Sequence, residues 1–333
     1  MAESSTSDLP TYAYVAGQLA TRLVDITSDP AALDTTGFWV VVLTFEGSLS
    51  CLRFADVRPA ALPAGRPWQP ATGGWSSSLR HDEYLSAVEQ IRAAIADGEV
   101  YQVNLCRRLA TPMPADTDLT GLAARLQSGN PAPHFTVVQA AGIGVVSASP
   151  ERFLSREGAL LTTQPIKGTA ATAEAMLDKD VAENVMIVDM ARNDLSRVAD
   201  TGSVEVTALC RPEEHPGLVH LVSTVQARLR PGVRWAEILD LLTPAASISG
   251  APKDAALQYI GKLEPVPRET YCGLVGWVDA SIGRADLAVA IRTFWRSEGE
   301  LRFGTGAGIT WASDPEGEWQ ETELKARNLI GLA

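Results

Sequence analysis

The sequence predicts an α+β fold, a layered sandwich in which large, mostly antiparallel sheets carry helices on their outer side. The expected helices and strands do not alternate as the βαβ units of a parallel sheet do. Many apolar runs are short and separated by turn residues, as in hairpins and meanders. The chain of 333 residues is 46% hydrophobic and 20% charged, an ordinary composition for a globular protein with a large core.

The first part of the chain is rich in expected strands. The segments FWVVVLTFEG and SLSCLRFADV predict a β-hairpin that turns at Glu46 and Gly47. Residues 60–77 are rich in proline and glycine and predict a loop or an internal boundary. We expect three parts: a disordered stretch over residues 1–10, a shortened β-rich part over 11–77, and a main domain over 78–333 that is continuous with 11–77.

The next element is a helix that begins at residue 81. Its apolar residues recur at helical spacing, and Gly98 follows them as a stop signal. A longer helix is predicted over residues 173–195, with Val181, Val185, Val188 and Met190 as its apolar stripe. The other expected elements are a strand over 100–111, three strands with turns over 143–168, a strand over 218–229, helices over 235–243 and 251–263, a meander of strands over 273–312 and a helix over 315–332.

Charge and cysteine content exclude several classes of protein. The net charge of −12 argues against nucleic-acid binding, which needs clustered lysine and arginine. The four cysteines are scattered without a CxxC pair, which fits a reducing, cytoplasmic location. No apolar run approaches 18 residues and no signal peptide is visible, so we expect no membrane partner. The four histidines lack HExxH-type spacing.

Lys167 stands in an unusual setting, in the segment TTQPIKGTAA. The apolar run before it and the glycine after it predict a strand that ends in a tight turn. An ammonium group that loses part of its hydration there has a lowered pKa and can act as a nucleophile or base. A solvated turn lysine is the alternative, and the segment alone does not decide between them.

Two glycine-containing segments are candidate anion sites. GTGAGI at 304–309 is not a dinucleotide loop, because ITWASDPEG rather than a helix follows it. Its glycines allow backbone N–H groups to approach an anion such as a carboxylate. SGAPK at 249–253 predicts a helix start, whose N-terminus is a weaker anion site. For both segments a tight turn is the alternative.

Carboxylates on two expected helices are candidate metal ligands. Glu183 lies on the long helix, and Glu318, Glu321 and Glu323 lie on the last one. Two helices that each present a glutamate to one cleft could hold Mg²⁺, which prefers one or two carboxylates plus substrate oxygens and waters. A solvated helix face is the alternative. The segment ARNDLSR at 191–197 could likewise form a structural salt-bridge network or take part in catalysis.

Ten segments taken together are far more specific than any one of them. In chain order they are YQVNLCRR, SPERF, PIKGT, AENVMIVDMARNDLSRV, HLVSTV, SISGAPK, YCGLVGW, AIRT, GTGAGI and QETELKA. Over residues 80–333 they resemble the chorismate-utilising enzymes, a family that includes anthranilate synthase component I, aminodeoxychorismate synthase component I, isochorismate synthase and salicylate synthase. The resemblance implies an anthranilate synthase component I-like fold and a chorismate-binding catalytic domain over residues 78–333.

The resemblance also implies the reaction. PIKGT is similar to the aminodeoxychorismate synthases, whereas anthranilate synthases have PIAGT. In the former, the lysine corresponding to Lys167 is thought to attack C2 of chorismate and displace the C4 hydroxyl. Ammonia then adds at C4 to give 4-amino-4-deoxychorismate, a precursor of 4-aminobenzoate and folate. Isochorismate and salicylate synthases carry a lysine base where this chain has Gln102, which cannot deprotonate water. The alternatives are an anthranilate synthase component I and a non-catalytic chorismate-binding paralogue.

The other site residues follow from the resemblance alone. Glu183 and Glu321 look like the Mg²⁺ ligands. Glu151 resembles the general acid that protonates the departing hydroxyl, and His220 resembles a histidine near the ring. The expected substrate-binding residues are Tyr271 and Arg292 for the enolpyruvyl carboxylate, Lys325 with the N–H groups of Gly306 and Gly308 for the ring carboxylate, and Ser249 and Thr169 as lining residues.

The sequence departs from the family in three respects. PAASISGAPK, with Ala245 and Ala246, stands where relatives often read PGGS or PAGT. The region before residue 80 is short, and no serine motif of tryptophan feedback is recognisable, so we expect no inhibition by tryptophan. No cysteine lies in a glutaminase-like GxCxG elbow. We therefore expect ammonia to come from a separate glutamine amidotransferase subunit.

Overall fold

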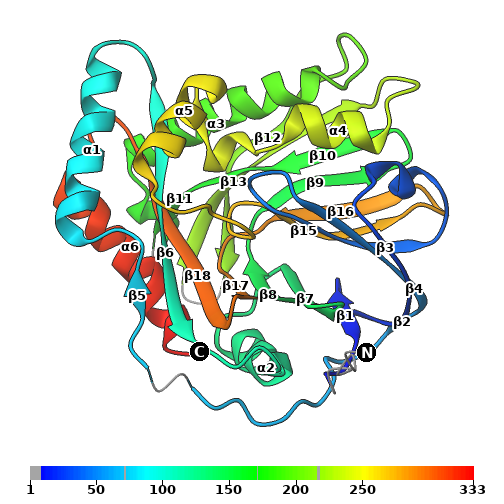
Figure 1. Ribbon diagram of the computed structural model, residues 1–333. Coiled ribbons are helices and arrows are strands. Elements are labelled where there is room, and N and C mark those ends of the chain that lie inside the picture. The colour runs from blue at the N-terminus through cyan, green and yellow to red at the C-terminus, as the bar shows by residue number, and fades with distance from the viewer. Residues whose placement is uncertain (1–8, 71–72, 171, 216–217) are drawn as a thin grey trace.

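The computed structural model describes residues 9–70, 73–170, 172–215 and 218–333. In this part of the chain, 18 strands join in one continuous sheet (Figure 1). The strands are β1 (Tyr12–Val15), β2 (Gln18–Thr27), β3 (Phe38–Leu43), β4 (Leu49–Pro59), β5 (Ser76–Ser77), β6 (Gln102–Pro112), β7 (His134–Ala140), β8 (Ile143–Ser149), β9 (Arg152–Glu157), β10 (Leu160–Gln164), β11 (Ile166–Ala170), β12 (Glu205–His215), β13 (Leu218–Arg228), β14 (Gly250–Ala251), β15 (Leu274–Asp279), β16 (Arg284–Val289), β17 (Thr293–Ser297) and β18 (Glu300–Ile309).

Every strand pair that the structure describes is antiparallel. Neighbours in the sheet follow the order β12, β13, β10, β9, β16, β15, β3, β4, β2, β1, β7, β8, β17, β18 and β6. β11 pairs with β13 at one end, and β5 and β14 pair with β6 at the other. The predicted hairpin is confirmed as β3 and β4. The predicted fold class, with its mostly antiparallel sheets, is confirmed as well.

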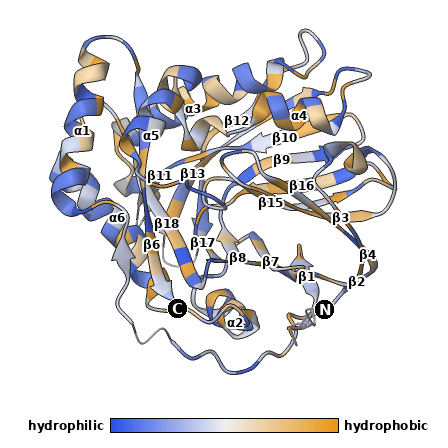
Figure 2. Cartoon of the chain, in the orientation of Figure 1, coloured by the Kyte–Doolittle hydropathy of each residue, from blue (hydrophilic) through white to orange (hydrophobic). Residues whose placement is uncertain are grey.

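The helices lie along the outside of the sheet, and both hydrophilic and hydrophobic residues occur along them (Figure 2). α3 packs on β11, β12 and β13, and α6 packs on β18. No helix in the described ranges is both long and apolar enough to cross a membrane. The helices are α1 (His81–Ala96), α2 (Thr120–Gly129), α3 (Asp178–Ser196), α4 (Trp235–Leu242), α5 (Lys253–Leu263) and α6 (Pro315–Ile330), with short 3₁₀ turns η1 (Pro30–Asp34), η2 (Ala173–Ala175) and η3 (Ala246–Ile248).

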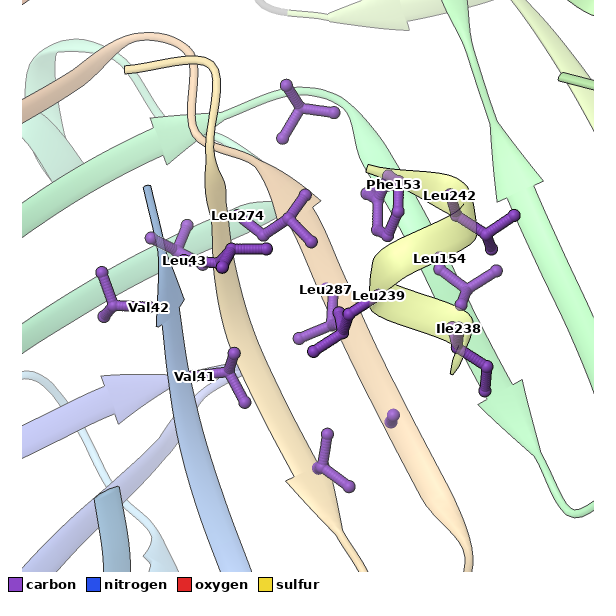
Figure 3. Packing of buried hydrophobic residues seen from close by; sticks show 14 of the residues in the cluster. Val41, Val42, Leu43, Phe153, Leu154, Ile238, Leu239, Leu242, Leu274 and Leu287 are labelled. Carbon is purple, nitrogen blue, oxygen red and sulfur yellow. The ribbon is translucent and has the colours of Figure 1, made fainter. Parts of the chain in front are cut away.

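The main core lies between the sheet and these helices. Figure 3 shows its centre, where leucines of α4 pack against Phe153 and Leu154 of β9 and Leu287 of β16. Leu154 and Leu287 have almost no exposed surface. Each such side chain stabilises the fold by roughly 1.5–3 kcal/mol relative to exposure. This packing makes the sheet a rigid support for the residues at its two ends.

The apolar stripe predicted for the long helix is partly wrong. Val181 and Val185 are 41% and 45% exposed. The buried side of α3 carries Asn184, whose Nδ2 donates to the Leu221 carbonyl at 2.8 Å. The buried face of α3 therefore has a polar residue, Asn184, at its centre. A prediction from apolar residues alone places the buried stripe on the exposed side of the helix. Val188 is buried, together with Ile187, Ala191 and Leu195.

Other differences from the expected elements are small. α2, β7 and β12 were not among the expected elements. Within the expected meander, β16 and β17 are separate strands, and Arg292, which has φ +52°, lies between them. The predicted disorder over residues 1–10 falls largely on residues 1–8, which lie outside the described ranges.

Gly276 gives a test of the sheet packing. It lies in β15 with φ +153°, and a Cβ there would lie 2.2 Å from the carbonyl oxygen of Asp286 in β16. We expect Gly276→Ala to lower the free energy of unfolding by about 3 kcal/mol, because backbone must move.

Gly261→Ala in α5 is the matched control. Nothing lies within 4 Å of a Cβ at Gly261, so this change should raise stability by about 0.5–1 kcal/mol. Urea unfolding of both variants measures the difference. Equal effects of the two substitutions would contradict the β15–β16 packing.

Candidate active site

Lys167 lies inside a strand rather than at the end of one, so the predicted tight turn is wrong. The register of β11 against β13 shifts between Ile166 and Thr169, which is a β-bulge. Gly168 has φ +83° at this bulge, and a Cβ there would lie 2.9 Å from the Cβ of Asp180 in α3. A bulge can re-aim a side chain beside a functional site. Here it positions Lys167, whose carbonyl accepts from Asn184 Nδ2 at 3.3 Å.

Three glycines of β18 lie on one face of the strand, because side chains alternate along it. A Cβ at Gly308 would lie 2.4 Å from Gln102 Nε2, 3.2 Å from Asn104 Oδ1 and 3.4 Å from Lys167 Nζ. The amine of β11 and the amides of β6 therefore meet over a glycine of β18. The two ends of the sheet close on each other at this point.

Side chains also pack directly against the other two glycines, Gly304 and Gly306. A Cβ at Gly306 would lie 2.6 Å from Cys106 Sγ, and one at Gly304 would lie 2.0 Å from Tyr271 Cγ. GTGAGI is thus part of a strand paired with β6 and not a tight turn. Glycine is needed at these positions because neighbouring side chains pack directly against the strand. The sequence alone did not predict this role for Gly304, which lies against the Tyr271 ring.

The electrostatic environment of Lys167 favours its neutral amine. Burial lowers the pKa of Lys167, and the nearby Lys325 ammonium lowers it further. The carboxylates of Glu183, Glu151 and Glu321 oppose this shift without cancelling it. A neutral amine has the free lone pair that a nucleophile needs.

Glu151 is shifted in the opposite direction. Its side chain is 6% exposed, and burial raises its pKa to about 7, although a hydrogen bond from Ser247 and the Lys167 charge lower it. A carboxyl that keeps its proton near neutral pH is suited to general acid catalysis. Glu151 and Lys167 are close enough to influence each other, as the predicted roles require.

Carboxylates of α3 and α6 face a common region. The pKa of Glu318 is raised by burial and by the charges of Glu321 and Glu183. Glu318 is therefore a third candidate metal ligand, which the resemblance did not select. The sequence pattern had already named Glu318 as a candidate, and its spacing of three residues from Glu321 in EWQE places the two on one face of α6. Glu323 instead pairs with Arg107.

This donor set fits a magnesium ion. Mg²⁺ prefers carboxylate oxygens and usually keeps several waters, so one or two protein ligands suffice. Within the described ranges, no three His, Cys, Asp or Glu side chains already converge as a preformed metal cluster. Lys325, one turn after Glu321, pairs with its Oε1 at 2.6 Å and donates to the Gly306 carbonyl at 3.1 Å. α6 thus presents both carboxylates and an ammonium beside the glycines of β18.

Tyr271 and Arg292 adjoin strained backbone. Arg292 has φ +52°, and Cys272, directly after Tyr271, has φ +62°. Such non-glycine residues cost about 1–3 kcal/mol and cluster at functional sites. Desolvation lowers the pKa of the Arg292 guanidinium, and no carboxylate in the described ranges forms an ion pair with it. A desolvated arginine of this kind suits an incoming carboxylate.

The remaining expected residues have different surroundings. His220 is buried in β13, where its backbone pairs with that of Thr169. The Thr169 side chain lies outside the described residues. Ser249 is fully buried, and its hydroxyl donates to the Ala245 carbonyl at 2.9 Å. Its own carbonyl accepts from the Asn104 N–H at 2.8 Å, which ties the SGAPK segment to β6.

Two buried amides carry polar atoms without a partner among the described residues. These atoms are Gln102 Oε1 and Asn104 Nδ2, and their side chains are 1% and 7% exposed. Unsatisfied buried polar atoms are costly and often mark the place of a ligand or water. Asn104 is a site residue that the resemblance did not single out. Its alternation with Gln102 along one face of β6 is the signal that could have found it.

Comparisons with known proteins give a family match and several similar relatives. The family described as chorismate binding enzyme matches residues 46–331. Anthranilate synthase component 1 of Streptomyces coelicolor is 37% identical over 81% of this chain and 55% of its own length. Aminodeoxychorismate synthase component 1 of Salmonella typhimurium is 36% identical over 78% of this chain and 59% of its own. The chain thus spans between about half and three-fifths of these relatives.

Solved structures agree with the fold. Anthranilate synthase component I from Streptococcus pneumoniae has a TM-score of 0.82 at 22% identity, over 99% of this chain and 94% of that one. The menaquinone-specific isochorismate synthase of Escherichia coli has a TM-score of 0.80 at 21% identity, over 98% of this chain and 90% of that one. The expected fold resemblance is therefore confirmed.

The raised pKa of Glu151 makes stability depend on pH. Below pH 4.5 the carboxyl is protonated in both the folded and unfolded states. Between 4.5 and about 7 the unfolded chain loses this proton while the folded chain keeps it. Stability therefore falls as pH rises through this window. Relative to Glu151→Gln, the wild-type free energy of unfolding should fall by about 3 kcal/mol between pH 4.5 and 8.

Urea unfolding at a series of pH values measures this difference. Other titrating groups cancel in the comparison, because both proteins contain them. Stability curves that stay parallel across the window would show that Glu151 ionises normally in the folded protein.

Proposed function

The chain belongs to the family of chorismate binding enzymes, and from this premise we propose that it aminates chorismate with ammonia to 4-amino-4-deoxychorismate. The observation that carries the proposal is the position of Lys167 Nζ, next to the Gln102 and Asn104 amides over Gly308. A water-activating lysine is absent from position 102, and a lysine amine stands beside the substrate region instead. This arrangement favours attack by the protein's own amine over attack by water.

The proposed reaction has two steps. The neutral amine of Lys167 attacks C2 of chorismate, both ring double bonds shift, and the C4–O bond breaks. Glu151 gives its proton to the departing hydroxyl, which leaves as water. Ammonia then adds at C4, both double bonds shift back, and the C2–N bond breaks to release the Lys167 amine. The desolvation of both groups supports these roles, since it favours an uncharged amine and a protonated acid.

The substrate carboxylates would be held at two places. Arg292 and Tyr271 would bind the enolpyruvyl carboxylate, which the lack of an ion-pair partner for Arg292 supports. Lys325 and the β18 backbone at Gly306 and Gly308 would bind the ring carboxylate. Glu183, Glu321 and Glu318 would hold Mg²⁺, which when bound would neutralise the ring carboxylate as a Lewis acid. His220, Ser249 and Thr169 would line the site.

The ammonia source and pathway belong to the same proposal. The aminodeoxychorismate synthase relative is named as a component 1, which supports a second, glutamine amidotransferase component. The product would feed 4-aminobenzoate and folate synthesis. Residues 11–77 and 78–333 would act as one catalytic unit, since β3 pairs with β15 and β1 with β7.

The rival function is anthranilate synthase component I, because that relative is as similar in sequence as the aminodeoxychorismate synthase. In the rival reaction ammonia attacks the ring directly and Lys167 has no chemical role. The identity of the product therefore distinguishes the proposed function from the rival function. Purified chain, chorismate, Mg²⁺ and excess ammonium at alkaline pH should give a species with the mass of aminated chorismate, which an added lyase converts to 4-aminobenzoate. Fluorescent anthranilate would establish the rival.

Lys167→Ala tests the mechanism. We expect the rate of amination to fall by about 10³-fold or more, because loss of a covalent nucleophile removes the main reaction path. Lys262→Ala, a change of an exposed lysine on α5, should leave the rate unchanged. Mass spectrometry of quenched wild-type enzyme should find an adduct on Lys167. Full activity of Lys167→Ala would exclude the covalent route.

A further inference from the structure

A cavity lies next to Glu151, on the inner side of α3. Its water-accessible volume is about 40 Å³, which is room for about two or three water molecules. Most of its wall is apolar, from β9, α3 and α4. Its polar groups come from separate elements and include Glu151, Ser247 of η3, Thr163 of β10 and Asp194 of α3. A small water cluster there would have the several polar partners that buried waters need.

The proposed reaction leaves Glu151 without its proton in every cycle. Water departs with that proton, and the amine formed at C4 retains its own proton as an ammonium group at neutral pH. Lys167 leaves C2 as a neutral amine and returns no proton. Glu151 must therefore take its next proton from solvent, although it is 6% exposed. A buried acid with this requirement needs a path to the surface.

Asp194 is the cavity's second carboxylate. Its Oδ2 accepts from Lys253 Nζ at 2.9 Å, and the two side chains are 14% and 17% exposed. The pair thus reaches the surface while Asp194 also lines the cavity. Burial raises the pKa of Asp194, and Lys253 and Arg197 oppose the shift. The burial effect is the larger, so protonation of Asp194 is easier than for an exposed aspartate.

The other charged groups near the cavity are already engaged. Arg152 also lines it, but its Nε donates to Asp286 at 3.0 Å, and the guanidinium bonds Gln164 as well. Lys167 faces Glu151 and is the nucleophile of the proposed reaction. Among the described residues of the cavity wall, Asp194 is the only acid besides Glu151.

We propose that this cavity is a proton path from solvent to Glu151, and that Asp194 is the positioning residue that supplies protons to it through the cavity water. Asp194 takes a proton from solvent at its exposed edge and passes it to a cavity water. That water passes a proton to the Glu151 carboxylate, and Asp194 is left ionised beside Lys253 until the next cycle. The inference rests on the proposed function for the role of Glu151 as acid.

Asp194→Asn tests the path. With saturating chorismate and excess ammonium, we expect kcat for chorismate consumption to fall about tenfold or more at pH 8 and less at pH 6, where solvent protons are more abundant. KM should stay within about twofold. Imidazole buffer, raised at constant ionic strength, should restore much of the lost kcat as an external proton donor. A merely structural role for Asp194 would show neither the pH-dependent loss nor the rescue.

Asp189→Asn is the matched control, since Asp189 lies on α3 with its side chain 77% exposed and paired with Arg192. It should leave kcat unchanged. Ala191→Val provides a second route if Asp194→Asn does not fold. It narrows the cavity from the α3 wall and should lower kcat with the same pH dependence.

The outcomes separate the two proposals. A kcat loss that is equal at all pH values and not rescued, or no loss at all, overturns the proton path while wild-type activity stands. Wild-type protein that consumes no chorismate overturns the proposed function, and the proton path with it.

Discussion

The absence of side chains at three alternate positions of β18, residues 304, 306 and 308, is the constraint on which the site depends. The space beside these glycines is filled by side chains of other elements. They are the Tyr271 ring, the Cys106 thiol, the Gln102 and Asn104 amides and the Lys167 amine. Any larger residue would push β6 or the Lys167 bulge away and separate the two ends of the sheet. The long antiparallel sheet can therefore close on itself only because every second residue of β18 from Gly304 to Gly308 is glycine. The catalytic groups meet at the point of closure.

Desolvation at this closure shifts the pKa values of the two central groups, downward for Lys167 and upward for Glu151. In water at neutral pH, a lysine would be charged and a glutamate ionised, which is the wrong state for a nucleophile and for an acid. Burial disfavours both charged forms and shifts the two pKa values toward each other. One physical effect thus prepares Lys167 and Glu151 together. A surface pair with the same residues would gain only a weak ion pair.

The sequence predicted the fold class, most of the helices and strands, and the residue types of the site. It did so because periodicity and motif order are local properties. The bulge at Lys167, the buried amide of Asn184 on α3 and the packing of Tyr271 over Gly304 were missed, because each is determined by packing partners distant in the chain. Gly308 and Lys167 illustrate this. They are 141 positions apart in the sequence, yet a Cβ at Gly308 would lie 3.4 Å from Lys167 Nζ.

The PAAS segment, residues 244–247, lies beside Glu151. Ala245 and Ala246 line the cavity beside Glu151 and are buried, and Ser247 of the same turn bonds the Glu151 carboxyl. The departure therefore alters the surroundings of the acid rather than the residues proposed to hold the carboxylates. Its effect should appear in proton transfer before it appears in substrate affinity, because both alanines line the cavity beside Glu151.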